Sequence, residues 1–243
     1  MNSSASPHDY AMRPSDAKKI RDADVIIWFG PELETFMSRM VKNDRRVITL
    51  SELEGIKFRE FADLQAHDGH NHGSIDPHFW LGISFTDRIA EAIAEQLALL
   101  DPENEQQYLD NYQVFSSQLQ VVKQELVEAL SPVREHGYFV FHDAYGYFEE
   151  EFGLNKLGHF TVSPERKPGA KTLIQIRTTL AKGEAKCVFA EPQFTPAVIQ
   201  SVTRGTDVPV GILDPVASTI EAKSGSYIEY ARQIASSFTD CLL

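Results

Sequence analysis

The sequence predicts an α/β protein with two parallel-sheet lobes joined by one long rigid helix. Short β-rich runs alternate with helical patterns in both halves of the 243-residue chain, and a helical pattern of about seven turns separates the halves. Strands that alternate with helices favour parallel sheets with helices on both faces. We predict a first lobe over residues 1–102, a linker helix over 103–131 and a second lobe over 132–243.

The first lobe is predicted from two apolar runs and the segments that follow them. The runs at 23–30 and 45–50 have the length of buried strands, and a helix over 31–42 between them begins with a proline in its first turn. After a histidine-rich loop at 65–76, residues 84–100 form an amphipathic pattern with Ser84 suited to be the N-cap.

The linker helix is predicted from one apolar stripe that ends before Pro132. Its members recur at steps of four and three residues, as one face of a helix requires. No Gly/Ser-rich linker occurs, so we expect a rigid connection between the lobes. The stripe consists of Tyr108, Tyr112, Phe115, Leu119, Val122, Leu126 and Leu130.

The second lobe repeats the alternation of strands and helices. Gly153 is placed to stop the first of its helices, because glycine adopts the left-handed conformation that ends many helices. The predicted strands span 137–141, 157–162, 187–190 and 208–213, and the predicted helices span 144–153, 169–183, 195–205 and 226–238.

The composition excludes some classes of function. A hydrophobic content of 42% with 24% charged residues is typical of a globular protein. No apolar run approaches the roughly 18–20 residues that a membrane span requires. The net charge of −12 disfavours nucleic acid as a partner, because phosphate binding needs a basic patch.

Three histidines and one aspartate lie where ligands bind in such folds. Ligands gather at the carboxyl ends of parallel strands, and His142 and Asp214 directly follow predicted strands, while His8 and His78 lie in loops of the first half. Three imidazoles and a carboxylate would fill a tetrahedral zinc site. The spacings carry no local signature, and each residue taken alone has an ordinary explanation, as a surface, core, capping or turn residue.

The remaining histidines and the cysteines leave alternatives open. His67, His70 and His72 form a short tract of a kind that binds metal weakly, and a solvated loop is equally compatible with it. His159 in a predicted strand is a further candidate ligand or a satisfied core residue. The two cysteines, Cys187 and Cys241, are either buried thiols or a disulfide, which would stabilise the fold by about 4 kcal/mol.

Six segments resemble a known family. They read HDYAMRPSDAKKI, DPHFWLG, GYFVFHDAYGYFEEEFG, LGHFTVSPE, CVFAEPQF and LDP, in order from His8 to nearly the end of the chain. Together they resemble the metal-specific solute-binding proteins, and in particular the periplasmic zinc-binding component of bacterial zinc ABC transporters. The resemblance implies two lobes with Zn²⁺ bound between them, no catalysis, a monomer in the periplasm, and delivery of zinc to a membrane permease.

The resemblance also assigns residues. His8, His78 and His142 match the family's three zinc-binding histidines, and manganese-binding relatives have a glutamate at the third position. Some members have a glutamate before the first histidine, where this chain has Pro7, so the fourth ligand is expected to be Asp214 or water. The resemblance further implies a Cys187–Cys241 disulfide, and a second, weaker metal site of His159 with His67, His70 and His72.

The chain departs from the family pattern at two places. The histidine-rich loop is short for the family, and a signal peptide with a strand–helix unit is expected before His8, where only seven residues stand. We therefore expect a truncated first lobe that is less stable than the second.

The alternative functions are a zinc-dependent hydrolase with Asp143 or Glu191 as general base, and a metal-binding surface adhesin, which would need a lipid-anchored cysteine.

Overall fold

The computed structural model describes residues 8, 10–61, 75–162, 167–194 and 197–243. The chain divides into two compact units, each with its own sheet and core. The N-terminal unit lies within residues 5–80 and 85–116, and the C-terminal unit contains residues 81–84 and 117–243. No described helix is long and apolar enough to span a bilayer.

The N-terminal unit contains a small parallel sheet. Among its described residues the sheet has two strands, β1 (Ile26–Trp28) and β2 (Val47–Thr49), as predicted. The indole N–H of Trp28 donates to the Thr49 hydroxyl at 2.9 Å. Helix α1 (Pro14–Asp22) packs on Ile26 and Trp28, whereas α3 (Ile83–Leu100) contributes Ile89 to a second apolar cluster with Ile48.

The helix predicted over 31–42 is wrong in its extent. The structure has a turn after Pro31, then the 3₁₀ turn η2 (Thr35–Met37) and the single α-turn α2 (Ser38–Val41). The Glu34 carboxylate accepts the backbone N–H groups of Phe29 at 3.0 Å and of Gly30 at 3.4 Å, and Gly30 has φ 145°. This carboxylate holds the turn at the end of β1, and the backbone of Glu34 itself (φ −102°, ψ 59°) interrupts the expected helix.

Ser84 is not the N-cap of α3, because the helix begins one residue earlier, at Ile83. The Glu151 carboxylate from helix α5 (Gly146–Phe152) takes over the capping role. Its oxygens accept the Ser84 backbone N–H at 3.1 and 3.2 Å and the Ser84 hydroxyl at 2.5 Å. A negative charge is favourable at this end of a helix, and Lys123 pairs with the same carboxylate at 2.9 Å.

The long helix α4 (Glu105–Leu130) has the predicted apolar stripe. Leu119, Val122, Leu126 and Leu130 are buried, and the 3₁₀ turn η6 (Ser131–Val133), which contains Pro132, follows the helix directly. The first part of α4 belongs to the N-terminal unit and the part from Ser117 onward belongs to the C-terminal unit. The remaining 3₁₀ turns of the described residues are η3 (Leu50–Glu52), η4 (Phe79–Leu81) and η5 (Pro102–Asn104).

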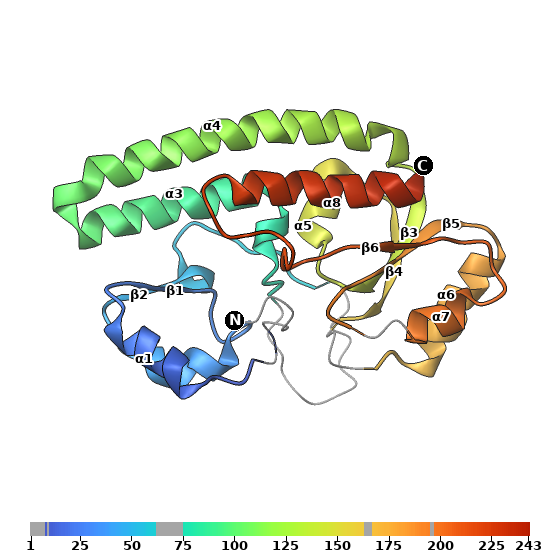
Figure 1. Ribbon diagram of the computed structural model, residues 1–243, viewed down its shortest axis with the longest axis horizontal. Helices are drawn as coiled ribbons and strands as arrows, with labels where there is room; N and C mark the ends of the chain where they lie inside the picture. Colours follow the sequence, from blue (N-terminus) through green and yellow to red (C-terminus); the bar gives the residue numbers. More distant parts are fainter. Residues whose placement is uncertain (1–7, 9, 62–74, 163–166, 195–196) are drawn as a thin grey trace. The chain divides into compact units, whose positions relative to one another are not determined.

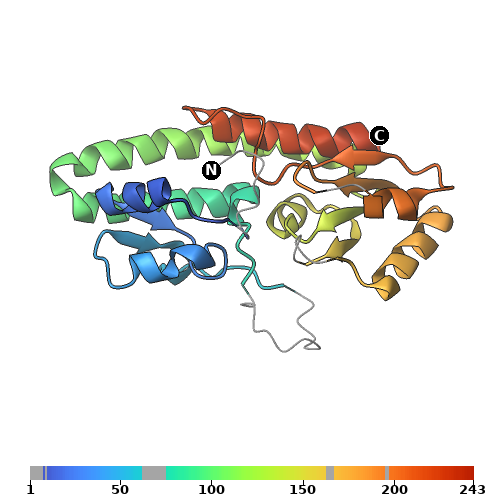
Figure 2. The ribbon, with the colours of Figure 1, turned by 60° about the horizontal axis from the view of Figure 1, so that its bottom comes forward.

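The C-terminal unit is built on a parallel sheet in the order β4-β3-β5-β6. Helices α5 and α8 cover one face of this sheet, and α6 and α7 cover the other (Figure 1, Figure 2). The predicted alternation of strands and helices is confirmed. The elements are β3 (Gly137–His142), β4 (Lys156–Thr161), α6 (Ala170–Ala181), β5 (Ala185–Ala190), α7 (Ala197–Thr203), β6 (Val210–Ile212) and α8 (Ser226–Leu242).

Alternate residues of β3 supply the two cores of this unit. Phe139 and Phe141 pack into an apolar cluster with α6 and α7, which includes Ile176. Tyr138 points to the other face, where its ring contacts Phe238 of α8 at a centroid distance of 5.2 Å. Strand β3 is therefore buried on both faces, which explains its continuous apolar run.

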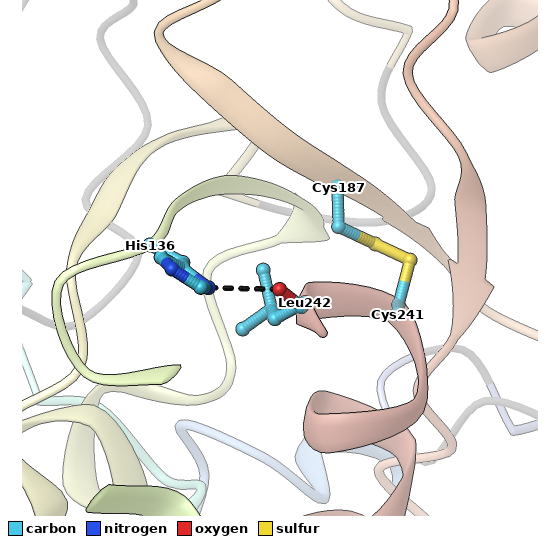
Figure 3. Close-up of a disulfide and its surroundings, with 4 residues drawn as sticks. All are labelled: His136, Cys187, Cys241 and Leu242. Atoms are coloured by element: carbon cyan, nitrogen blue, oxygen red, sulfur yellow. Dashed lines mark hydrogen bonds between the residues drawn. A yellow bond between two sulfur atoms is a disulfide. The ribbon is translucent and has the colours of Figure 1, made fainter. Parts of the chain in front are cut away.

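The disulfide implied by the family resemblance is confirmed. Cys187 of β5 is bonded to Cys241 of α8, with 5.9 Å between the Cα atoms (Figure 3). Beside this bond, Nδ1 of His136 donates to the Leu242 carbonyl at 2.8 Å. The end of α8 is thus attached at two points, once to the sheet and once to the loop that precedes β3.

Candidate metal site

His8 and His78 face each other within the N-terminal unit. Their Nε2 atoms are 3.2 Å apart, and their ring centroids are 5.3 Å apart. Two imidazole ligands of a tetrahedral zinc ion, each with a Zn–N bond of about 2.0–2.1 Å, would have their nitrogens about 3.3 Å apart. These two nitrogens therefore have the separation that neighbouring ligands of one zinc ion need.

A buried carboxylate fixes the ring of His78. Asp76 accepts from both the backbone N–H of His78 at 3.0 Å and its Nδ1 at 2.7 Å through the same oxygen, Oδ1. The His78 residue is only 2% exposed, and its ring also lies against Trp80. With Nδ1 used in this way, Nε2 carries the lone pair that a metal can take, which is the arrangement of metal-bound histidines in general.

His142 shows the same arrangement in the C-terminal unit. It is the last residue of β3 and is 2% exposed, and its Nδ1 lies 2.6 and 2.8 Å from the two carboxylate oxygens of Glu191. The Tyr145 hydroxyl lies 3.3 Å from Glu191 Oε1. Burial and the nearby Glu191 raise the pKa of Tyr145 well above its usual value, so its hydroxyl remains a donor.

Asp214 follows β6, as predicted, and organises a turn. Its Oδ1 accepts from the Gln193 side chain at 2.8 Å and from the Val216 backbone at 3.2 Å. Its Oδ2 accepts from both the backbone and the hydroxyl of Ser218 at 2.6 Å. Four hydrogen bonds therefore reach this carboxylate, and a metal would have to replace or share some of them.

His159 belongs to a separate charged cluster on β4. Its Nδ1 lies 3.6 Å from Asp143, which is also paired with Lys156 at 2.6 Å, and Lys156 in turn contacts Glu149 at 2.7 Å. A register shift opposite Tyr138 lets β4 residues 156 and 159 both reach Asp143. His67, His70 and His72 lie outside the described residues, so their joint site with His159 stays a prediction.

Opposing effects set the ionisation of this cluster. Burial raises the pKa of the Glu149 carboxyl, although the neighbouring Lys156 acts to lower it. For Lys156, burial alone would lower the pKa, but the charges of Glu149 and Asp143 outweigh it and raise the pKa above its usual value. The two carboxylates expected as general bases of a hydrolase both accept hydrogen bonds in the structure. Asp143 accepts from Lys156, and Glu191 accepts from His142.

Sequence reasoning missed the supporting roles of Asp76 and Glu191. Asp76 stands two residues before His78, a spacing that lets one carboxylate reach both the backbone and the ring. Glu191 follows β5, the neighbour of β3, so the parallel order brings it beside His142. A search for carboxylates at the ends of neighbouring strands would have found Glu191.

The fold and the site resemble those of known metal-binding proteins. The two-unit α/β fold, with histidines held by carboxylates, is that of a metal-type solute-binding protein. A solved structure titled "Crystal structure of ZnuA" matches with a TM-score of 0.82 at 25% identity, over all of this chain and 89% of the other. The family model "Zinc-uptake complex component A periplasmic" matches residues 1–241. The chain belongs to this ZnuA family of periplasmic zinc-uptake components.

Curated relatives agree with the family assignment. The "High-affinity zinc uptake system protein ZnuA" of Yersinia pestis is 42% identical over 98% of this chain and 81% of its own length. The protein with the same description from Haemophilus ducreyi is 37% identical over 98% of this chain and 83% of its own length. Proteins of this family are solute-binding proteins rather than enzymes, so the hydrolase alternative is wrong.

Proposed function

We propose that this chain captures one Zn²⁺ ion with His8, His78 and His142 and delivers it to the permease of a zinc ABC transporter. The observation that carries the proposal is the 3.2 Å separation of the His8 and His78 Nε2 atoms. It matches the spacing of two zinc ligands. His142, with its Nδ1 occupied by Glu191, is prepared in the same way as His78 to offer Nε2.

The kind of ligand favours zinc. Neutral imidazole suits borderline divalent metals, whereas Mn²⁺ and Mg²⁺ prefer sites richer in oxygen. The names of the curated relatives, which are zinc-uptake proteins, support the same choice. If Asp214 completes the set, protein ligands surround the ion, whereas catalytic zinc keeps an exchangeable position for substrate.

The fourth ligand is proposed to be either Asp214 or a water molecule. Asp214 carries the negative charge that would offset part of the charge of Zn²⁺, but its four hydrogen bonds oppose a change of partners. Replacing Asp214 by asparagine separates the two cases. Zinc affinity falls if the carboxylate binds the ion and stays nearly constant if water does.

The proposed location and partners are supported by the family. Its description as periplasmic supports work in an oxidising compartment, where the Cys187–Cys241 disulfide is stable. There the protein would work as a monomer that carries zinc to its permease.

Zinc titration tests the proposal. We expect one tight site per chain, lost or strongly weakened by His142→Ala. His136→Ala is the matched control, because the side chain of His136 contacts the Leu242 carbonyl, which is outside the candidate site, and its loss should leave zinc affinity unchanged. Tight binding that survives in His142→Ala would contradict the assignment.

A second, weaker site is proposed for His159 with the histidine-rich tract. Deletion of residues 67–72 should remove weak zinc binding and leave the tight site, because the described contacts of His78 lie outside the deleted segment. Loss of the tight site after this deletion would assign the main binding to the tract.

A further inference from the structure

We infer that Arg59 is a positioning residue for zinc binding: it fixes the Asp76 carboxylate, which in turn fixes the ring of His78. This inference rests on the proposed function, since it concerns the affinity of the same metal site. Arg59 lies 19 residues before His78 in the chain and is not itself placed to be a ligand, because its guanidinium carries no lone pair for a metal.

The contacts between Arg59 and Asp76 run in both directions. Nη1 of Arg59 donates to Asp76 Oδ2 at 2.8 Å, and the backbone N–H of Asp76 donates to the Arg59 carbonyl at 2.8 Å. The adjacent residues Glu60 and Ile75 form an antiparallel bridge. Two segments of the chain are thus joined at this point, and both the backbone and the carboxylate of Asp76 are held.

The two oxygens of Asp76 have separate tasks. Oδ1 accepts from His78, and Oδ2 pairs with Arg59. A carboxylate held through both oxygens cannot rotate without breaking a charged contact. The plane of the Asp76 carboxylate, and with it the direction of the His78 ring, is therefore set by Arg59.

The burial of Asp76 makes the partner important. Asp76 is 0% exposed, and a carboxylate taken out of water is costly unless an opposite charge compensates it. Arg59 supplies this charge from a side chain that is 16% exposed. Without Arg59, the Asp76 carboxylate would move toward water or other donors. The ring of His78 would then have to become ordered when the metal binds.

The supporting carboxylate in the other unit has a different described partner. Glu191, which holds His142, is approached by the neutral hydroxyl of Tyr145 at 3.3 Å. Asp76 is approached by a guanidinium at 2.8 Å. Charged hydrogen bonds are shorter and stronger than neutral ones, so the positioning effect should be larger for Arg59 than for Tyr145.

Substitution of Arg59 is expected to weaken zinc binding without removing a ligand. Arg59→Met should lower the zinc affinity about 10- to 100-fold, the usual range for residues that support metal ligands. Arg59→Lys should restore part of the loss, since lysine keeps the charge but not the planar guanidinium. The measurement is competition of the purified full chain with a fluorescent zinc chelator, at a temperature where each variant is folded.

Arg46→Met provides the matched control. Arg46 lies in the same unit and pairs with a carboxylate, Asp44, at 2.6 Å, but this pair is at the surface and does not include Asp76. The control should lose some stability and keep wild-type zinc affinity. If Arg59→Met does not fold, the zinc affinities of Arg59→Lys and Arg46→Lys are compared instead. We then expect weaker zinc binding in Arg59→Lys and wild-type binding in Arg46→Lys.

A double-mutant cycle with His78→Ala separates positioning from general damage. If Arg59 acts through His78, Arg59→Met should have no further effect on the residual zinc affinity of His78→Ala. An equal loss in both backgrounds, or unchanged affinity in Arg59→Met alone, would overturn the inference. If the wild-type protein lacks tight zinc binding, or His142→Ala retains it, the proposed function fails, whatever the result for Arg59.

Discussion

The two units hold their candidate ligands in different ways. In the C-terminal unit, His142 is the last residue of β3, an interior strand of a parallel sheet. Helices cover both faces of this sheet, and a disulfide joins it to α8. In the N-terminal unit, the described sheet has two strands of three residues, and His8 and His78 lie outside them. Of these candidates, His142 is positioned by a sheet, whereas His78 is positioned by the hydrogen bonds of Asp76.

The described support of the two histidines differs in kind, because a guanidinium contacts Asp76 whereas a neutral hydroxyl contacts Glu191. A strand end fixes the backbone of His142, so Glu191 has only to set its ring. His78 lacks such a frame, and Asp76 holds both its backbone and its ring while Arg59 holds Asp76. Ligands on irregular segments need more hydrogen bonds to reach the same precision.

The largest expected effect concerns the disulfide. Replacing Cys187 and Cys241 by serine should lower the free energy of unfolding of the C-terminal unit by about 4 kcal/mol, because the unfolded chain regains the freedom of a long loop. Hydrogen exchange read by mass spectrometry should show slower exchange in the core of the C-terminal unit than in that of the N-terminal unit. The variant with both cysteines replaced should show a smaller difference in exchange rate between the two cores. Equal protection of the two units in the wild type would contradict the comparison.

The next effect concerns the support of His142. Glu191→Gln removes the charge that orients the ring but keeps a similar shape, so zinc affinity should fall about 10-fold, or about 1.4 kcal/mol. Isothermal titration with a competing chelator measures this change. Tyr145→Phe is the milder companion, with a smaller loss expected. Wild-type affinity in Glu191→Gln would show that the strand alone positions His142.

The smallest effect is a pH dependence of the N-terminal unit. Arg46 lowers the pKa of Asp44 to about 2, from an ordinary value of 3.8. A folded-state pKa below the unfolded value adds stability above pH 3.8 that is lost as the pH falls through about 2. Asp44→Asn should therefore make the stability of this unit less sensitive to pH between 4 and 2. Urea unfolding at several pH values tests this, and parallel curves for the two proteins would refute it.

Much of the fold could be predicted because its signals are local. The apolar run around β3 and the glycine that ends α5 act within a few residues, and both predictions are confirmed. The helix expected over 31–42 is interrupted at Glu34, whose backbone angles of φ −102° and ψ 59° lie outside the helical region. The N-cap expected at Ser84 failed because Glu151, which is 67 residues away, supplies the cap. Such contacts depend on tertiary structure, which periodicity does not contain.

The candidate site could be predicted only in part, for the same reason. His142 and Asp214 were found from their place after strands and His8 and His78 from their place in loops of the first half, and the resemblance then assigned the three histidines to one zinc site. The tasks of Asp76, Glu191 and Arg59 are visible only when the side chains are placed, because each acts through another residue. Sequence patterns therefore indicated the candidate ligands and left out the groups that orient them.

The central claim is that one Zn²⁺ ion is held by His8, His78 and His142. A crystal structure of the zinc-loaded protein, with anomalous difference density at the zinc edge, tests it most directly. We expect one strong peak with the Nε2 atoms of all three histidines at about 2.0–2.1 Å. A fully occupied zinc ion bound elsewhere, or one that does not contact His142, would contradict it.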